Sequence, residues 1–194
     1  SPTTAEHVRS HLGSRVDLVL DGGPCSVGLE STVLSLVGSH PAILRAGGIP
    51  REDIEAVLGM TVQAAPACGP VSSPGQTSSH YSPRTPIVLA SAGHKGRAGA
   101  RAGLLRFGRQ SDTTGFVAVE DLSAEGDVRE AAIHLFAALH RLDALGLDVI
   151  VADPVPESGL GVAVMDRLRR ASRRPPSRKR DDAFHTTREA GASQ

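Results

Sequence analysis

The strongest constraint on the fold is a break in hydrophobic patterning between residues 62 and 85. Through this stretch Pro, Gly, Ser and Ala replace the apolar runs on either side, which is typical of a linker. In a chain of 194 residues the break predicts two units, residues 1–61 and residues 86–172. Residues 173–194 are basic and polar with little to bury, so we expect a disordered tail there.

Both units combine short apolar runs with helical periodicity. In residues 1–61 we expect strands over 16–20, 31–37 and 42–44, with helices over 4–12 and 51–58. In residues 86–172 we expect strands over 86–90, 103–107, 115–119 and 147–152, with helices over 128–145 and 160–172. The fold class is therefore α/β, with a partial twisted open sheet followed by a small Rossmann-like unit.

Composition narrows the classes of function. Lys plus Arg and Asp plus Glu each number 21, so no whole-molecule field favours nucleic acid or membrane. No apolar run approaches the ~18 residues of a membrane helix, which predicts a cytoplasmic protein without a membrane partner. Cys25 and Cys68 do not have metal-ligand spacing, so we expect reduced thiols and no metal site.

A glycine-rich segment at residues 21–33 is the first candidate site. Its small residues let backbone amides approach a ligand closely, and Ser31 and Thr32 add hydroxyls. The spacings of a phosphate loop and of a dinucleotide fingerprint are both absent. A glycine-rich hairpin without a ligand remains the alternative.

Two further segments carry candidate functional side chains. Arg45 stands before two glycines, where a guanidinium could clamp phosphate; a surface arginine at a strand end is the alternative. His80 and Tyr81 stand within residues 73–83, where an active-site lid and a plain polar linker both fit the composition.

Taken in order, these segments resemble the Sua5/YrdC/YciO family. The matching pieces of the YrdC-like catalytic domain, from its second half, are residues 1–4, 23–33, 43–45 and 47–49. Residues 73–83 resemble the linker of the longer, Sua5-type members. The pieces that resemble the C-terminal domain of those members are residues 103–105, 132–142, 159–161 and 166–171.

The resemblance implies the activity of an L-threonylcarbamoyladenylate synthase, which begins the threonylcarbamoyladenosine modification of tRNA. In that reaction L-threonine takes up bicarbonate-derived carbon dioxide as a carbamate. The carbamate attacks the α-phosphate of ATP, giving threonylcarbamoyl-AMP and pyrophosphate. The resemblance also implies Mg²⁺ with the ATP, and a tRNA threonylcarbamoyl-transferase complex as the partner that uses the product.

Site roles follow from the same resemblance. Thr3, Arg45 and His80 match positions that contact ATP. Ser31 matches the position that contacts threonine, and Tyr81 would pack beside His80 in a lid. The resemblance gives no assignment of a catalytic acid or base.

The sequence departs from the family pattern in several places. Ala46 replaces the usual proline, Ser35 replaces a common aspartate, and residues 76–79 lack the basic side chains often found there. The last difference leaves less positive charge near the triphosphate. The family's Lys-x-Arg and Ser-x-Asn motifs have no counterpart ahead of Ser1, which is not an initiator Met. We therefore expect further residues upstream and expect the chain alone to be inactive.

Two other interpretations stay open. The first is a nucleotide- or RNA-binding module without catalysis, with the basic run at residues 173–180 contacting RNA; a solvated tail is the other explanation of that run. The second is a degenerate structural fragment. A comparison of tRNA affinity with and without residues 173–194 tests the RNA interpretation.

Overall fold

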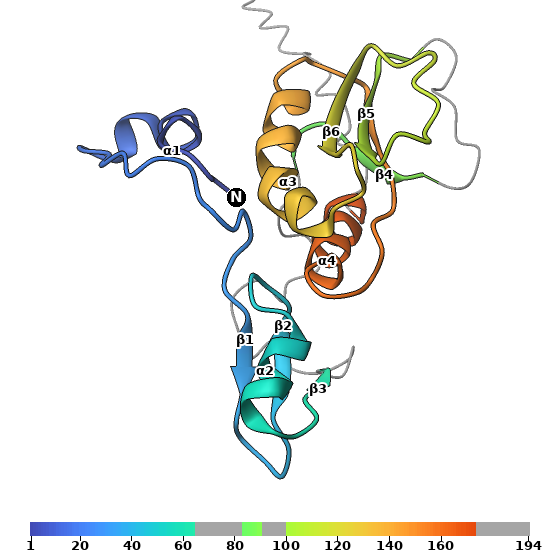
Figure 1. Ribbon diagram of the computed structural model, residues 1–194. Helices are drawn as coiled ribbons and strands as arrows, with labels where there is room; N and C mark the ends of the chain where they lie inside the picture. The colour runs from blue at the N-terminus through green and yellow to red at the C-terminus, as the bar shows by residue number, and fades with distance from the viewer. Residues whose placement is uncertain (65–82, 91–99, 174–194) are drawn as a thin grey trace, which may run out of the picture.

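The computed structural model describes residues 1–64, 83–90 and 100–173. Residues 1–64 contain a three-stranded sheet with two α-helices, and the described residues of 83–90 and 100–173 contain a four-stranded sheet with two more (Figure 1). The predicted α/β class is confirmed. Most of the predicted linker and tail lies outside the described residues.

The first unit is built around a small mixed sheet. Its elements are α1 (Ala5–Leu12), the 3-10 helix η1 (Gly13–Arg15), β1 (Val33–Ser35), β2 (Ala42–Arg45), α2 (Arg51–Leu58) and β3 (Gln63–Ala64). β1 and β2 pair antiparallel, and β3 pairs with β2 in parallel. β3 has no signal in the sequence, because two residues are too few for a periodic pattern.

Glycines end both α-helices of this unit, which begin and end close to the predicted residues. α1 is followed by Gly13 at φ 52°. α2 is followed by Gly59 in the left-handed region, whose N–H donates to the Glu55 carbonyl oxygen at 2.8 Å. At the other end of α1, the Thr4 hydroxyl accepts a hydrogen bond from the His7 amide at 3.3 Å. These local signals explain why both helix predictions are confirmed.

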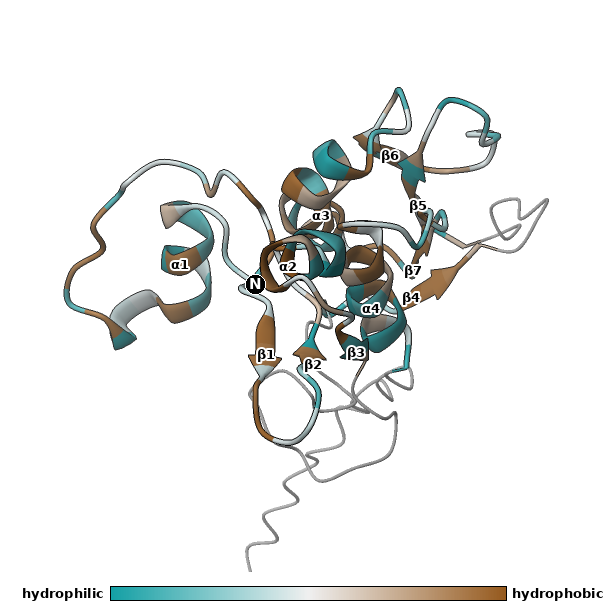
Figure 2. Cartoon of the chain, turned by 60° about the horizontal axis from the view of Figure 1, so that its bottom comes forward, coloured by the Kyte–Doolittle hydropathy of each residue, from teal (hydrophilic) through white to brown (hydrophobic). Residues whose placement is uncertain are grey.

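The strand predicted over residues 16–20 does not form. Leu18 and Leu20 are 76% and 86% exposed, and the segment between α1 and β1 arcs away from both sheets (Figure 2). No strand in the described part of the chain pairs with it. An apolar run forms a strand only where a neighbour satisfies its backbone amides and carbonyls, which the hydrophobic pattern alone does not reveal.

The second unit is a parallel sheet with helices. Its elements are β4 (Ile87–Leu89), β5 (Ala102–Phe107), β6 (Ala118–Ser123), α3 (Val128–Asp143), β7 (Val149–Ala152) and α4 (Gly161–Ser172). The strand order is β4-β7-β5-β6, and every pairing is parallel. β7, the last strand of the described residues, therefore lies between the first two described strands of this unit.

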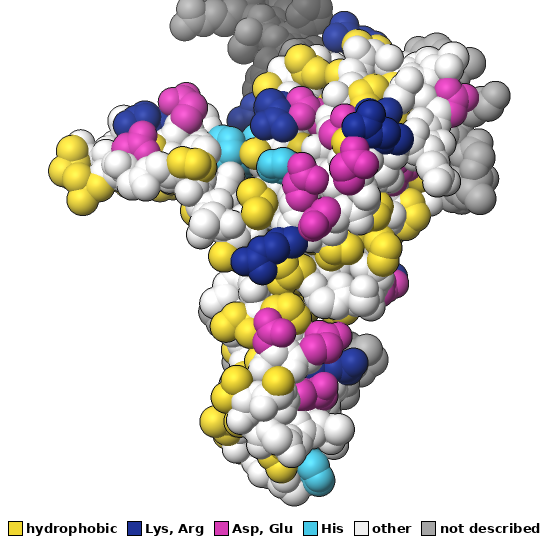
Figure 3. Space-filling model, in the orientation of Figure 1, with side chains coloured by type: hydrophobic (Ala, Val, Ile, Leu, Met, Phe, Trp, Pro, Cys, Tyr) yellow, Lys and Arg dark blue, Asp and Glu magenta, His cyan; other side chains and the backbone are white. Residues whose placement is uncertain are grey.

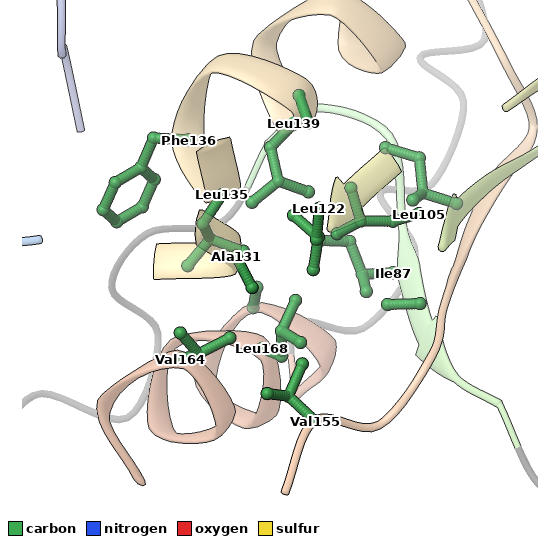
Figure 4. Close-up of a cluster of buried hydrophobic side chains, with 14 of the residues drawn as sticks. Ile87, Leu105, Leu122, Ala131, Leu135, Phe136, Leu139, Val155, Val164 and Leu168 are labelled. Carbon is green, nitrogen blue, oxygen red and sulfur yellow. The ribbon is translucent and has the colours of Figure 1, made fainter. Parts of the chain in front are cut away.

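The core of the second unit fills the space between the sheet and the two helices (Figure 4). Strand side chains such as Leu105 and Leu122 point toward α3 and are fully buried. Leu135 from α3 and Leu168 from α4 meet them and are also fully buried. Burial of one such side chain contributes about 1.5–3 kcal/mol, so this cluster is the main source of stability for the unit.

β6 begins and ends later than the strand predicted over residues 115–119. The apolar pattern stops at Glu120 and Asp121, yet both lie within the strand. Each carboxylate is paired: Glu120 with Arg141 at 2.6 Å and Asp121 with Arg106 at 2.5 Å. β6 is an edge strand in the described sheet, where charged side chains can reach solvent and ion-pair partners.

The first unit contacts the second through residues 28–30. Gly28 has φ 74°, and a Cβ there would lie 2.3 Å from the Ala132 carbonyl oxygen and 2.5 Å from the Ile133 Cα in α3. Leu29 packs against the core of the second unit. Glycine is needed here for both its backbone conformation and its lack of a side chain.

We predict that Gly28→Ala lowers the free energy of unfolding by about 2 kcal/mol or more, because strained φ and backbone overlap add together. Gly38→Ala is the matched control, since Gly38 also has positive φ, at 106°, but nothing lies within 4 Å of its added Cβ. Denaturant midpoints measure both. Equal losses would contradict the contact between Gly28 and α3.

Candidate functional site

Two of the residues predicted to bind substrates meet where β1 and β2 pair. The Arg45 guanidinium donates to the Ser31 carbonyl oxygen from Nη2 at 2.9 Å and from Nε at 3.3 Å. Nη2 also lies 3.3 Å from the Ser31 hydroxyl. Ser31 is exposed, so its hydroxyl is accessible beside a permanent positive charge. An amino acid and a phosphate group could be bound next to each other here.

The loop that follows β2 is hydrogen-bonded to the residues on either side of Ser31. The Gly48 amide donates to the Glu30 carbonyl oxygen at 2.8 Å. The Thr32 hydroxyl donates to the Ile49 carbonyl oxygen at 2.6 Å and accepts from the Ile49 amide at 3.1 Å. A Cβ at Gly47 would lie 2.3–2.5 Å from the backbone of residues 30–32. The glycines noted in the sequence therefore serve backbone-to-backbone packing beside the site.

Thr3 lies in a different set of contacts. It is 7% exposed, its carbonyl oxygen accepts from the Cys25 amide at 2.9 Å, and its hydroxyl lies 3.2 Å from His7 Nδ1. It therefore anchors the glycine-rich segment to the start of α1. His80 and Tyr81 lie outside the described residues.

Glu30 links these parts of the first unit and was not singled out from the sequence. Its carboxylate accepts a hydrogen bond from the Ser1 hydroxyl and forms an ion pair with Arg167 of α4 at 3.0 Å. Burial alone would raise the pKa of Glu30, but hydrogen bonds from Ser1 and a backbone amide, with the charge of Arg167, lower it below its usual value. Glu30 is therefore held as an anion.

The sequence did contain a signal for Arg167. It lies on the buried stripe of α4 that also carries Val164, Leu168 and Ala171, at helical spacing. A charged residue on such a stripe needs a partner, because an unpaired buried charge is strongly unfavourable. Here the partner comes from the other unit, which helical periodicity cannot show.

Three histidines meet where α1 contacts α3. The ring of His140 lies 4.1 Å from that of His7 and 4.8 Å from that of His11, between centroids. Figure 3 shows histidine side chains gathered at this junction, on a face where basic and acidic side chains are interspersed. Among the described residues, no group of three His, Cys, Asp or Glu side chains is arranged to hold a metal ion.

A cleft of about 510 Å³ opens between the two units. Its lining residues are Gly48, Ile49, Pro50 and Asp53 from the first unit and Val128, Arg129, Ser158, Gly159 and Leu160 from the second. Thr3, Ser31 and Arg45 do not line it. These three predicted substrate residues therefore lie outside this cleft.

No described helix is long and apolar enough to span a membrane.

Comparison with known families identifies the chain. Residues 49–173 match the family described as "Threonylcarbamoyl-AMP synthase, C-terminal domain", and residues 1–47 match the family described as "Telomere recombination". This α/β protein thus pairs part of a YrdC-type domain with a second domain. The chain belongs to the Sua5 family of threonylcarbamoyl-AMP synthases, which confirms the resemblance drawn from the motifs.

Curated relatives extend over most of the chain. A threonylcarbamoyl-AMP synthase of Pyrococcus abyssi is 36% identical over 184 residues, covering 89% of this chain and 54% of the relative. One from Bacillus subtilis is 33% identical over 184 residues, covering 89% of this chain and 53% of the relative. The chain therefore spans about half the length of these relatives.

Solved structures agree with this assignment. The crystal structure of P. abyssi Sua5 complexed with L-threonine has a TM-score of 0.76 at 34% identity, covering 89% of this chain and 54% of that one. A P. abyssi Sua5 variant in which a neighbouring histidine and tyrosine are both changed to alanine has a TM-score of 0.74 at 33% identity, covering 89% and 53%.

We predict that the stability of the chain depends on pH through His140. Burial, followed by the nearby His7 and His11, lowers the pKa of His140 from 6.5 to about 4, against a hydrogen bond to the Ser1 carbonyl oxygen. Between these two values the unfolded chain binds a proton that the folded chain does not. The free energy of unfolding should therefore fall as pH falls from 6.5 toward 4.

Denaturant unfolding of wild-type chain and His140→Gln, from roughly half a pH unit above to roughly two units below the pKa of a free histidine, measures this dependence. The variant should lose part of the acid sensitivity. His40→Gln, in the exposed loop between β1 and β2, controls for the removal of one histidine. An unchanged pH slope in His140→Gln would contradict the prediction.

Proposed function

We propose that the full-length protein containing this chain is an L-threonylcarbamoyladenylate synthase. The observation that carries the proposal is the contact between Arg45 and Ser31, with guanidinium and hydroxyl 3.3 Å apart. Relatives named threonylcarbamoyl-AMP synthase, and a P. abyssi Sua5 structure that contains L-threonine, support it. An amino-acid hydroxyl site beside a phosphate clamp is what a reaction between threonine and ATP requires.

The proposed reaction joins three substrates. The amine of L-threonine forms an N–C bond with bicarbonate-derived carbon dioxide and releases a proton, giving a carbamate. A carbamate oxygen then bonds to the α-phosphorus of ATP as the bond to the β-phosphate oxygen breaks. Pyrophosphate leaves and threonylcarbamoyl-AMP remains. The negative charge moves from the carbamate toward the pyrophosphate, so a fixed cation beside the phosphates lowers the barrier.

The residue roles in this proposal follow the family pattern. Ser31 contacts threonine, while Thr3, Arg45 and His80 contact ATP, and Tyr81 packs beside His80. The burial of Thr3 and its contacts with His7 and Cys25 support a role in shaping the glycine-rich segment. A P. abyssi Sua5 variant has been made at a histidine that is followed directly by a tyrosine, as His80 is followed by Tyr81 in this chain. This choice of residues supports a functional role for the pair.

Mg²⁺ enters this proposal with ATP. The described residues offer no carboxylate cluster for a resident ion. A small ion that keeps several waters is instead commonly bound through substrate phosphates, where it neutralises their charge. The product would pass to a tRNA threonylcarbamoyl-transferase complex in the cytoplasm.

We predict that the full-length protein releases pyrophosphate from ATP only when L-threonine and bicarbonate are both present, because the carbamate is the nucleophile. A coupled pyrophosphate assay with each component omitted in turn measures this. L-Serine replaces L-threonine as the control. Equal release without bicarbonate or with serine would refute the activity, and nucleotide binding without any release would favour a non-catalytic module.

We further predict that Arg45→Ala lowers kcat by more than it raises KM for threonine, because a phosphate clamp acts most strongly where charge moves. Steady-state kinetics of the full-length protein measure both constants. A kcat within a factor of two of wild type, about 0.4 kcal/mol, would show that Arg45 serves only to support Ser31.

A further inference from the structure

A single arginine of the second unit reaches the backbone that carries the candidate site. Arg167 of α4 is 1% exposed. Its Nε and Nη2 donate to Glu30 Oε2 at 3.1 and 3.0 Å, and Nη2 also donates to the Ala46 carbonyl oxygen at 2.9 Å. Nη1 donates to Asp166 Oδ2 at 2.8 Å. The guanidinium therefore bridges the two units through several directed bonds.

The two acceptors in the first unit flank the candidate substrate residues. Glu30 directly precedes Ser31, and Ala46 directly follows Arg45. Arg167 thus contacts the chain just before the hydroxyl assigned to threonine and just after the guanidinium assigned to phosphate. The Gly48 amide donates to the Glu30 carbonyl oxygen at 2.8 Å, so the loop after β2 also holds the backbone of Glu30.

This arrangement depends on the chemistry of arginine. A planar guanidinium can donate to a carboxylate and a carbonyl at fixed angles, whereas an ammonium group is a single point of charge. Removing the cation would leave the half-buried Glu30 carboxylate without its ionic partner, which is unfavourable. The neighbouring arginines differ, because Arg169 pairs with Glu157 and Arg170 pairs with Asp166, all within the second unit.

We propose that Arg167 is a positioning residue for the threonine site, so that the C-terminal domain sets the geometry of a site it does not itself line. Its bonds to Glu30 and Ala46 fix the separation of Ser31 and Arg45. The inference rests on the proposed synthase activity. It assigns Arg167 no contact with substrate, and its effect is on how well the serine hydroxyl and the arginine cation are aligned.

The test compares Arg167→Gln with Arg169→Gln in the full-length protein. Arg169→Gln also removes an ion pair of α4, but one that stays within the second unit. We expect Arg167→Gln to raise KM for threonine by about tenfold, against less than about twofold for Arg169→Gln. Arg167→Lys should recover part of the loss, because it keeps the charge but not the fork. L-Threonine affinity by calorimetry checks that KM follows binding.

Thermal midpoints separate positioning from general support of the fold. A purely structural arginine would lower the midpoint and leave KM for threonine and kcat of the folded protein unchanged, and that outcome overturns the proposal. Combining Arg167→Gln with Ser31→Ala gives a second criterion. If Arg167 acts through Ser31, the two effects on threonine affinity are not additive; additive effects overturn it.

Two further comparisons cover a variant that does not fold and a failure of the proposed activity itself. If Arg167→Gln does not fold, Glu30→Gln and Arg167→Lys replace it, and an unchanged KM for threonine in both overturns the proposal. Wild-type protein separates a failure of the proposed function from a failure of the positioning role. If it neither binds threonine nor releases pyrophosphate, the proposed function fails; if it does both while Arg167→Gln matches Arg169→Gln, only the positioning role fails.

Discussion

The desolvated guanidinium of Arg167 determines how the first unit sits on the second. A cation that is 1% exposed is tolerable only if acceptors replace the water it has lost, and those acceptors must lie at the angles of the guanidinium fork. Asp166 supplies one from its own helix, while Glu30 and the Ala46 carbonyl supply the others. Because these last two lie in the first unit, satisfying one buried charge also fixes the junction between domains.

Close backbone approach completes that junction. Gly28 lies against α3, and Gly47 lies against the chain around Ser31, at distances that a Cβ would not permit. The Gly28 contact places peptide groups rather than side chains at the interface between the units, and the Gly47 contact does the same beside Ser31 within the first unit. Peptide groups have fewer degrees of freedom than long side chains, so a geometry built from them varies less. The exposed Ser31 hydroxyl therefore stands on a comparatively rigid base.

Local signals predicted local structure well, and non-local contacts account for the errors. The ends of α1 and α2 follow from Thr4, Gly13 and Gly59, whose effects act within a few residues. The segment at residues 16–20 has the apolar pattern of a strand but no partner among the described residues. β6 accommodates Glu120 and Asp121 because arginines distant in sequence pair with them. Ser31 and Arg45, which the motifs singled out, are in contact in the structure, and their substrate roles stay a prediction. Glu30 and Arg167 could not be found in this way, because their pairing depends on a contact between units.

The strand order of the second unit has a consequence for how the protein is made. β4 and β5 each pair with β7, which occupies residues 149–152 and lies between them. On a ribosome, both earlier strands leave the exit tunnel before the strand that joins them has been synthesised. The edges that face β7 stay unpaired while the intervening residues are synthesised, roughly 60 after β4 and roughly 40 after β5, which takes several seconds at about 5–20 residues per second. Nascent chains of this domain should therefore expose unpaired strand edges until β7 emerges, and this is the period in which they are most prone to wrong pairing.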